Sequence, residues 1–271
     1  MSEQKVTIVV VTPAMASEWL KRNTRNRHIS ENYVDSLARD MEAGRWMFTH
    51  QGIAFDCDGN LLDGQHRLTA IVRSGVPLRM VVTHGMSRNS ISGIDQGNVR
   101  SASDVLKLGH SKDVGKRGMA IANAMAAGFA AQNYGRRSKL EQVEFYLEHE
   151  SAVNYAERAL PTGSVRLMNA GLAAVIARAS YTVDRSITDR FCQVLITGIT
   201  EEPRDATIIH LRDFVKGVGN KGTMYRVAIY RKTVMALDAF RAGRALGTLR
   251  AATKECFFLP GEAKPADLKV A

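Results

Sequence analysis

A strand, a tight turn, a second strand and a helix follow one another without interruption between residues 52 and 75. The stretch "GIAFD" is typical of a strand, and "CDGN" at 57–60 contains Asp-Gly, a strong hairpin turn signal. Leu61 and Leu62 return as the partner strand. A helix is predicted from Gly64 or Gln65 to about Ser74, where Gly75 stops it. A hairpin that runs directly into a helix predicts a small α/β unit in the first part of the chain.

The residues on both sides extend this unit. The β-branched stretch at 6–11 predicts a strand, and the following residues predict a helix to about 23 with Thr12 as its cap and Pro13 at its first position. Ser30 is predicted to cap an amphipathic helix that Gly44 ends, and residues 78–85 predict another strand. Residues 86–101 are mixed, and 102–110 predict the last helix of the unit.

Beyond residue 108 the chain is almost entirely helical in pattern. Helices are predicted over about 113–130, 139–159, 165–180, 186–198, 205–217 and 223–244. Ser138 and Glu141 fit a capping box at the start of one of them. We therefore predict an α+β fold with an α/β domain at 1–108, an all-helical domain at 109–259 and a flexible tail at 260–271.

Composition narrows the class of protein. The hydrophobic content of 45% is ordinary for a soluble globular chain, and no apolar run approaches the ~18–20 residues of a membrane helix. The stretch at 6–11 follows an acidic residue and lacks a cleavage pattern, so we interpret it as a strand and not as a signal peptide. The three cysteines, Cys57, Cys192 and Cys256, support neither a disulfide framework nor a metal site. We expect a cytoplasmic protein without membrane contact.

Charge is unevenly distributed. The net charge of +10 divides into +2 for residues 1–108, with 13 basic and 11 acidic residues, and +8 for residues 109–271, with 24 and 16. A basic C-terminal half is typical of a chain with a polyanionic partner, and DNA is the partner that we expect. The same charge also fits a soluble protein that is merely basic and has no polyanionic partner.

The start of the helix after the hairpin carries the most chemistry. Free backbone N–H groups at a helix start attract anions, and Gly64 lets a phosphate approach the backbone. Arg67 adds a forked charged donor, and His66 donates to a phosphate or moves a proton near neutral pH. Asp63 is a candidate ligand for Mg²⁺ or a base for a hydroxyl group. The alternative is a solvated helix start in which Asp63 is a cap and His66 and Arg67 are surface residues.

The stretch "DGQHRLTA" resembles the signature of the ParB/sulfiredoxin superfamily, a strand–helix element of the type G-x-x-R-x-x-A. Gly64, His66, Arg67 and Ala70 match it, and "NRHISENYVDSLARDMEAGRW" is similar to the first box of the family, with Asn26 and Arg27 as its loop residues. The resemblance covers about residues 5–108, and within the superfamily the chain most resembles ParB-like proteins of the phage or plasmid type. It implies a helix start that cradles the phosphates of ATP or CTP, usually with Mg²⁺.

The sequence also departs from the family pattern at several positions. Gln65 stands where sulfiredoxins have their catalytic cysteine, so sulfinic-acid reduction is not expected. Residues 95–106 are a loose counterpart of the ParB E-N-x-x-R box, in which Asp95 stands for the acid and Arg100 for the arginine. Asp63 matches the acid of a free-serine kinase of the superfamily. That kinase also has a catalytic glutamate in its first box, and no residue here is a secure counterpart. Glu31 is nearby, but it equally suits the first turn of its helix as a favourable acidic residue.

The resemblance and the residues together assign candidate roles. The catalytic candidates are Asp63 and His66, and the magnesium candidates are Asp63 and Asp95. The nucleotide-binding candidates are Asn26, Arg27, Gly64, Gln65, His66, Arg67 and Arg100. The DNA-contacting candidates are Arg136, Arg137, Lys221, Arg226, Arg231 and Lys232, which lie before a capped helix, in the glycine-rich loop "GVGNKGT" and on the last long helix.

Four functions remain open from the sequence. The first is a nucleotide-binding protein that hydrolyses ATP or CTP or uses it to gate DNA binding, and the second is an ATP-dependent kinase of a small molecule or a DNA base. The third is a ParB-like nuclease, and the fourth is a DNA-binding module without catalysis. A homodimer is one further partner arrangement that we consider.

Overall fold

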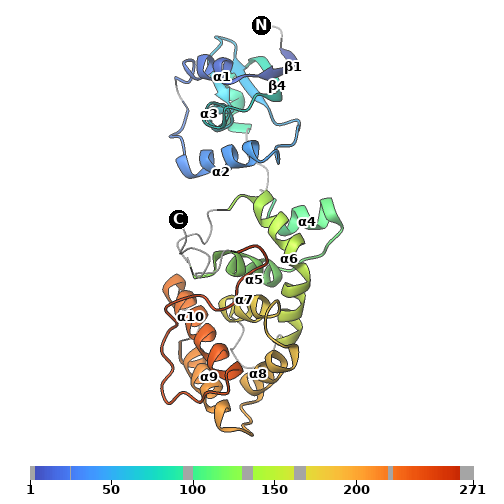
Figure 1. Cartoon of the computed structure of the whole chain (residues 1–271). Coiled ribbons are helices and arrows are strands. Elements are labelled where there is room, and N and C mark those ends of the chain that lie inside the picture. The colour runs from blue at the N-terminus through green and yellow to red at the C-terminus, as the bar shows by residue number, and fades with distance from the viewer. Residues whose placement is uncertain are drawn as a thin grey trace, which may run out of the picture. The chain divides into compact units, whose positions relative to one another are not determined.

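The computed structural model describes residues 4–24, 26–93, 100–129, 137–161, 169–218 and 222–262 (Figure 1). The fold is α+β, with a mixed four-stranded sheet and helices in the N-terminal part and mostly helices after it. The chain forms two compact units. The first contains the described residues up to Arg100 together with residues 137–141, and the second contains the rest. Helix α4 (Ala102–His110), which the sequence places in the first domain, belongs to the second unit.

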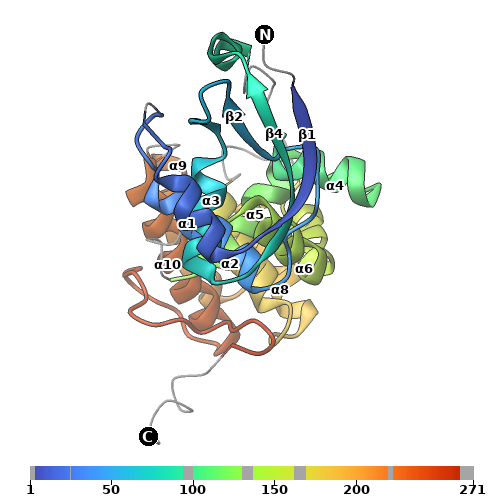
Figure 2. The same cartoon turned by 90° about the horizontal axis from the view of Figure 1, so that it is seen from above.

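The sheet of the first unit consists of β1 (Lys5–Val11), β2 (Ile53–Asp56), β3 (Leu61–Asp63) and β4 (Leu78–Met86). Its strand order is β1-β4-β2-β3, and Figure 2 shows β4 between β1 and β2. β4 runs antiparallel to β1 and parallel to β2, while β2 and β3 form the predicted antiparallel hairpin. The strands predicted from the sequence are confirmed.

Three helices of the first unit share one core with the sheet. They are α1 (Pro13–Leu20), α2 (Glu31–Glu42) and α3 (Gln65–Ser74), and α3 packs against both of the others. The buried residues that form this core include Ala16, Val34, Met41, Phe55, Leu68, Ile71, Met80 and Val82. In β1 the alternate residues Val6, Ile8 and Val10 are more than half exposed, as a strand with one packed face requires.

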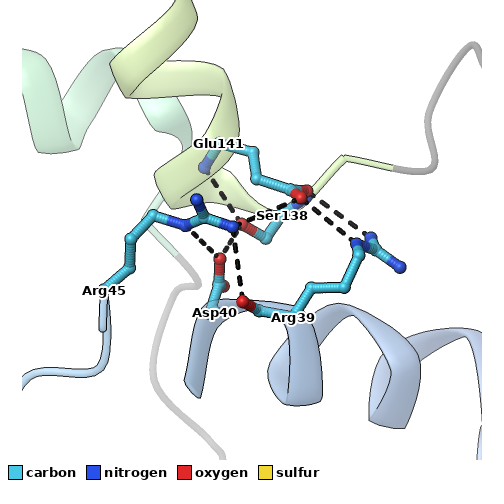
Figure 3. Close-up of polar contacts among 5 residues, drawn as sticks. All are labelled: Arg39, Asp40, Arg45, Ser138 and Glu141. Carbon is cyan, nitrogen blue, oxygen red and sulfur yellow. Dashed lines mark hydrogen bonds and ion pairs between the residues drawn. The ribbon is translucent and has the colours of Figure 1, made fainter. Parts of the chain in front are cut away.

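Residues 137–141 return to the first unit, close to the end of α2. The predicted capping box is confirmed, because the Glu141 N–H donates to Ser138 Oγ at 3.0 Å and the Ser138 N–H donates to Glu141 Oε2 at 2.6 Å. Arg39 and Arg45 both pair with the Glu141 carboxylate, as Figure 3 shows. Helix capping and contact with α2 therefore depend on the same two side chains.

The second unit is built from helices. After α4 these are α5 (Lys116–Ala127), α6 (Lys139–Ala159), α7 (Ala170–Ala179), α8 (Arg185–Thr197), α9 (Ala206–Val218) and α10 (Gly222–Arg241), with α6 beginning in the residues that pack with the first unit. Short 3₁₀ turns lie at Arg88–Gly93 and Pro203–Asp205. The core includes Ile121, Met125, Val153, Leu172, Val175, Phe191, Leu237 and Phe240. These helices agree with the predicted ones to within a few residues over the described ranges.

The segment after α10 is not helical, yet it is packed. Phe257 is fully buried and Leu259 nearly so. Arg178, on α7 and only 2% exposed, donates from Nε to the Phe257 carbonyl at 2.7 Å and from Nη1 to the Met125 carbonyl at 2.7 Å. Its Nη2 group also pairs with Glu262, the third residue of the stretch predicted to be a flexible tail. Residues 263–271 of that stretch lie outside the described residues.

Within the described ranges, none of the helices is both long and apolar enough to cross a lipid bilayer.

Candidate functional site

The turn from β3 into α3 depends on a glycine. Gly64 has φ = +101°, in the left-handed region that other residues rarely adopt. A Cβ atom at this position would lie 2.5 Å from Ile53 Cδ1, so the Ile53 side chain would have to shift to admit it. Glycine therefore suits this passage from strand to helix better than any other residue.

The first turn of α3 leaves backbone donors free. Gly64 donates its N–H to its neighbour Asp63 Oδ1 at 2.7 Å. The N–H groups of Gln65, His66 and Arg67 have no acceptor within the part of the chain that the structure describes. Together with the positive end of the helix dipole, such donors form the kind of place where proteins bind phosphate and other anions.

Asp63 and Arg67 line a pocket of about 260 Å³ beside this helix start, together with His50, Gly52 and Thr83. The Arg67 Nη1 group donates to the Gly52 carbonyl and lies 3.5 Å from Asp63 Oδ2. Its Nε and Nη2 groups have no partner among the residues that are described. The structure thus brings two of the predicted site residues together and leaves part of the Arg67 fork free for a ligand.

Gln65 points its amide to a different set of neighbours. Its Oε1 atom accepts from Asn23 Nδ2 at 2.9 Å, and its Nε2 group donates to the Arg27 carbonyl at 2.8 Å. Asn26 donates to Asn23 Oδ1 at 2.7 Å and to the Leu61 carbonyl at 2.9 Å. These amides hold the loop after α1 against β3 and α3, so the side chains of Gln65 and Asn26 position the site.

His66 is also bound within the fold. Its Nε2 atom accepts the Ser30 N–H at 3.0 Å, and its ring lies edge-on to Tyr33 at 5.4 Å between centroids. Burial lowers the pKa of His66, and the nearby charges of Arg27 and Arg67 lower this pKa further. His66 is therefore neutral near pH 7, with its proton on Nδ1 because Nε2 is an acceptor.

The contact between His66 and Ser30 differs from the expected cap of α2. The sequence predicts that the Ser30 side chain caps α2, whereas the Ser30 hydroxyl makes no capping bond and its N–H is held by His66. The influence of Arg27 and Arg67 on the pKa of His66 also places two guanidinium charges within electrostatic reach of the α3 start. Asp63 is the acidic group that opposes them there.

The remaining predicted site residues are spread along the chain. Arg100 is exposed at the end of the first unit. Asp95, Arg136 and Lys221 lie outside the described residues, so their predicted roles have no structural counterpart here. In the described ranges no group of three or more His, Cys, Asp or Glu side chains is placed to hold a metal ion.

Two predicted DNA-contacting residues are bound to their own chain. The Arg231 guanidinium lies 4.8 Å from the centre of the Phe129 ring and donates to the Phe129 carbonyl at 3.4 Å. The Lys232 ammonium lies 4.7 Å from the centre of the Phe214 ring and donates to the Leu249 carbonyl. Arg226 is exposed, and both it and Arg137 make further contacts within the chain.

Several residues of the site carry no motif that sequence reasoning can use. Asn23, His50 and Thr83 reach the site only through the tertiary fold. Position 52 must be glycine for a structural reason, because a Cβ at this position would lie 1.9 Å from the Val81 carbonyl oxygen. Comparisons with protein-family models, with curated proteins and with solved structures found no match to this chain.

Proposed function

We propose that the first unit binds a nucleotide, ATP or CTP, with its phosphates at the start of α3. The observation that carries this proposal is the group of three unpartnered N–H donors at Gln65, His66 and Arg67, with the charges of Arg27 and Arg67 close by. The resemblance of "DGQHRLTA" to the ParB/sulfiredoxin signature supports the same ligand. A phosphate is the anion whose several oxygens match this number of donors.

The residues present also fit a magnesium ion that arrives with the nucleotide. Magnesium keeps several waters and commonly takes one or two protein carboxylates besides phosphate oxygens. Asp63, whose side chain is 35% exposed in the pocket, is the carboxylate for this role. When bound, the ion would supply charge neutralisation next to the phosphates, while the free part of the Arg67 fork would orient them.

The helical unit is, in this proposal, the part that contacts DNA. Most of the excess of basic over acidic residues lies after residue 108, where there are 24 basic and 16 acidic residues. A charge excess of this kind attracts the phosphate backbone without reading sequence. Nucleotide binding in the first unit would then gate DNA contact or be followed by hydrolysis.

A second candidate function is favoured by the position of Asp63. Its carboxylate lines the pocket and is partly open to solvent, so it is accessible to a hydroxyl group of an acceptor. A carboxylate in this place accepts the proton of a hydroxyl nucleophile, as a phosphotransferase requires. Transfer of label from γ-labelled ATP to a hydroxyl acceptor, abolished in Asp63→Asn, would favour this function over a binding switch.

The deciding experiment is a titration of the chain with ATP, CTP, GTP and UTP in the presence of Mg²⁺. Arg67→Ala should weaken binding about tenfold or more, because a charge-assisted bond to phosphate is lost. Arg73→Ala is the matched control, since Arg73 lies on the same helix but pairs with Glu31 and Asp35. Absence of binding by all four nucleotides, or equal binding by the wild type and Arg67→Ala, would refute the proposal.

The DNA part of the proposal is tested by the same titrations with and without a DNA duplex. A gated protein should bind DNA with an affinity that changes when the nucleotide is added. Binding that falls steeply with salt but does not respond to any nucleotide would instead identify a DNA-binding module without a nucleotide switch.

A further inference from the structure

Helix α6 is interrupted next to a second pocket, which lies wholly within the helical unit. His149 has φ = −112° and ψ = 16°, outside the helical range, and so divides α6 into two segments. Just beyond this break is a pocket of about 310 Å³, lined by Ser151, Tyr155, Ser180, Tyr181, Arg185 and Thr188. The α6 segment after the break, the turn after α7 and the start of α8 therefore enclose one space.

The aromatic walls of this pocket are held in place by hydrogen bonds. The Tyr155 hydroxyl donates to Asp189 Oδ1 at 2.7 Å and lies 2.6 Å from Thr188 Oγ1. The Tyr181 hydroxyl lies 2.9 Å from Nδ1 of the buried His149. Burial raises the pKa of Tyr155 to about 12, so its hydroxyl stays protonated near pH 7. Both tyrosine side chains are thus held in fixed positions.

Two side chains beside the pocket have donors without a partner. The Arg185 guanidinium lies 4.8 Å from the centre of the Tyr155 ring, with Nε 3.7 Å from Asp189 Oδ2. Its two Nη groups have no partner among the described residues, and the same is true of the Ser151 hydroxyl. Arg185 already fills the position over the Tyr155 ring where a cationic ligand would stack.

The two carboxylates beside the pocket each use one oxygen. Asp184 Oδ1 accepts from the N–H and the hydroxyl of Ser186, and Asp189 Oδ1 accepts from Tyr155. The free fork of Arg185 favours a ligand that brings acceptor atoms, and a guanidinium fork matches a carboxylate or a phosphate best. Tyr181 and Val183 supply apolar lining for the rest of that ligand.

We propose that this pocket binds a small planar aromatic compound that carries one carboxylate or phosphate group. The anionic group lies at the Arg185 fork and Ser151, and the ring lies against Tyr181 and the apolar lining of the pocket. The volume of about 310 Å³ falls at the lower end of the range for small-molecule sites, which suits a single ring system with its anionic group. This site lies in the second unit and does not depend on nucleotide binding at α3.

Two probes distinguish the possible sources of this chemistry. 4-Hydroxybenzoate represents an aromatic acid, and adenosine monophosphate represents a free nucleotide. Each is titrated into the full chain by calorimetry and by two-dimensional NMR, and adenosine monophosphate is also titrated into Arg67→Ala, in which binding at the α3 start is weakened. The uncharged analogues 4-hydroxybenzyl alcohol and adenosine report what the anionic group adds to the affinity.

Arg185→Gln should weaken binding of the bound probe about tenfold or more, because its charged fork is removed. Ser151→Leu should also weaken binding, because the exposed α6 position can carry a larger side chain that fills the pocket. Arg158→Gln, an exposed arginine on the same helix outside the pocket, should leave binding unchanged. The proposal is overturned if neither probe binds, or if Arg185→Gln binds the probe as tightly as the wild type does.

Discussion

The buried carboxylate of Asp40 accepts a hydrogen bond from the Ser138 hydroxyl at 2.9 Å, although the two residues are 98 positions apart in the sequence. The same Oδ1 atom accepts from Arg45 Nε at 2.9 Å. Figure 3 shows Asp40 between Arg45 and Ser138, with Glu141 capping the helix beside them. One carboxylate at the end of α2 therefore receives donors from two separate segments.

We predict that Asp40→Ala destabilises the first unit by about 3 kcal/mol, because it leaves a guanidinium and a hydroxyl without their shared acceptor in a buried place. Chemical denaturation followed by circular dichroism measures this loss. Asp35→Ala on the same helix is the control, since Asp35 makes an exposed ion pair with Arg73 and its loss should cost much less. Equal costs for the two variants would contradict the structural role of Asp40.

Gly64→Ala should cost about 3 kcal/mol of folding stability, because a left-handed conformation and a collision with Ile53 are combined at one position. Gly75→Ala is the matched variant at the other end of α3. Gly75 also has positive φ, but nothing lies within 4 Å of an added Cβ, so only the backbone cost of about 1 kcal/mol is expected. Thermal and chemical unfolding of both variants checks the difference, which vanishes if Ile53 moves aside freely.

The lowered pKa of His66 predicts a pH dependence with a defined sign. The unfolded chain binds a proton at His66 near pH 6.5, and the folded chain binds it only at lower pH. The contribution of neutral His66 to stability is therefore fully present above pH 6.5 and is lost as the pH falls toward the folded-state pKa. Unfolding free energies of the wild type and His66→Gln, measured from pH 5 to pH 8, should converge toward the acidic end. Parallel curves would show that His66 titrates alike in both states.

Arg178→Met should destabilise the helical unit by about 3 kcal/mol or more, since it leaves the Met125 and Phe257 carbonyls and the Glu262 carboxylate without their buried donor. The segment after α10 should also become more sensitive to limited proteolysis, because Arg178 is the side chain that ties it to α7. Arg158→Met, at an exposed position on α6, serves as the control. Undiminished protease resistance in Arg178→Met would show that Phe257 and Leu259 hold the segment by packing alone.

The elements of this fold are encoded by local signals, and for this reason they could be predicted. Asp-Gly at the hairpin, Gly75 after α3 and the Ser138–Glu141 capping box each act over a few residues, and each is found where the sequence predicts it. The order of the strands and the return of residues 137–141 to the first unit involve contacts between distant positions, which no local pattern specifies.

The candidate site was predictable as a place but not in its detail. The sequence identifies Asp63–Arg67 as polar groups at a helix start, and the structure puts them there. The sequence does not reveal that Asp63 and Arg67 face a pocket while Gln65 and His66 bind the loop that precedes α2. The direction of these side chains depends on distant neighbours such as Asn23 and Ser30. Buried Arg178 could not be predicted either, because an arginine within "AVIARAS" gives no sign of the carbonyl groups that it will meet.

The division of labour within Asp63–Arg67 has a consequence for how such a signature is interpreted in evolution. Gly64, Gln65 and His66 form the turn and the bonds to the loop before α2, so selection for a stable chain alone would retain them. Asp63 and Arg67 face the pocket, and only selection for the proposed nucleotide binding would retain both. Under that proposal, the two groups of positions should change at different rates among descendants of this chain.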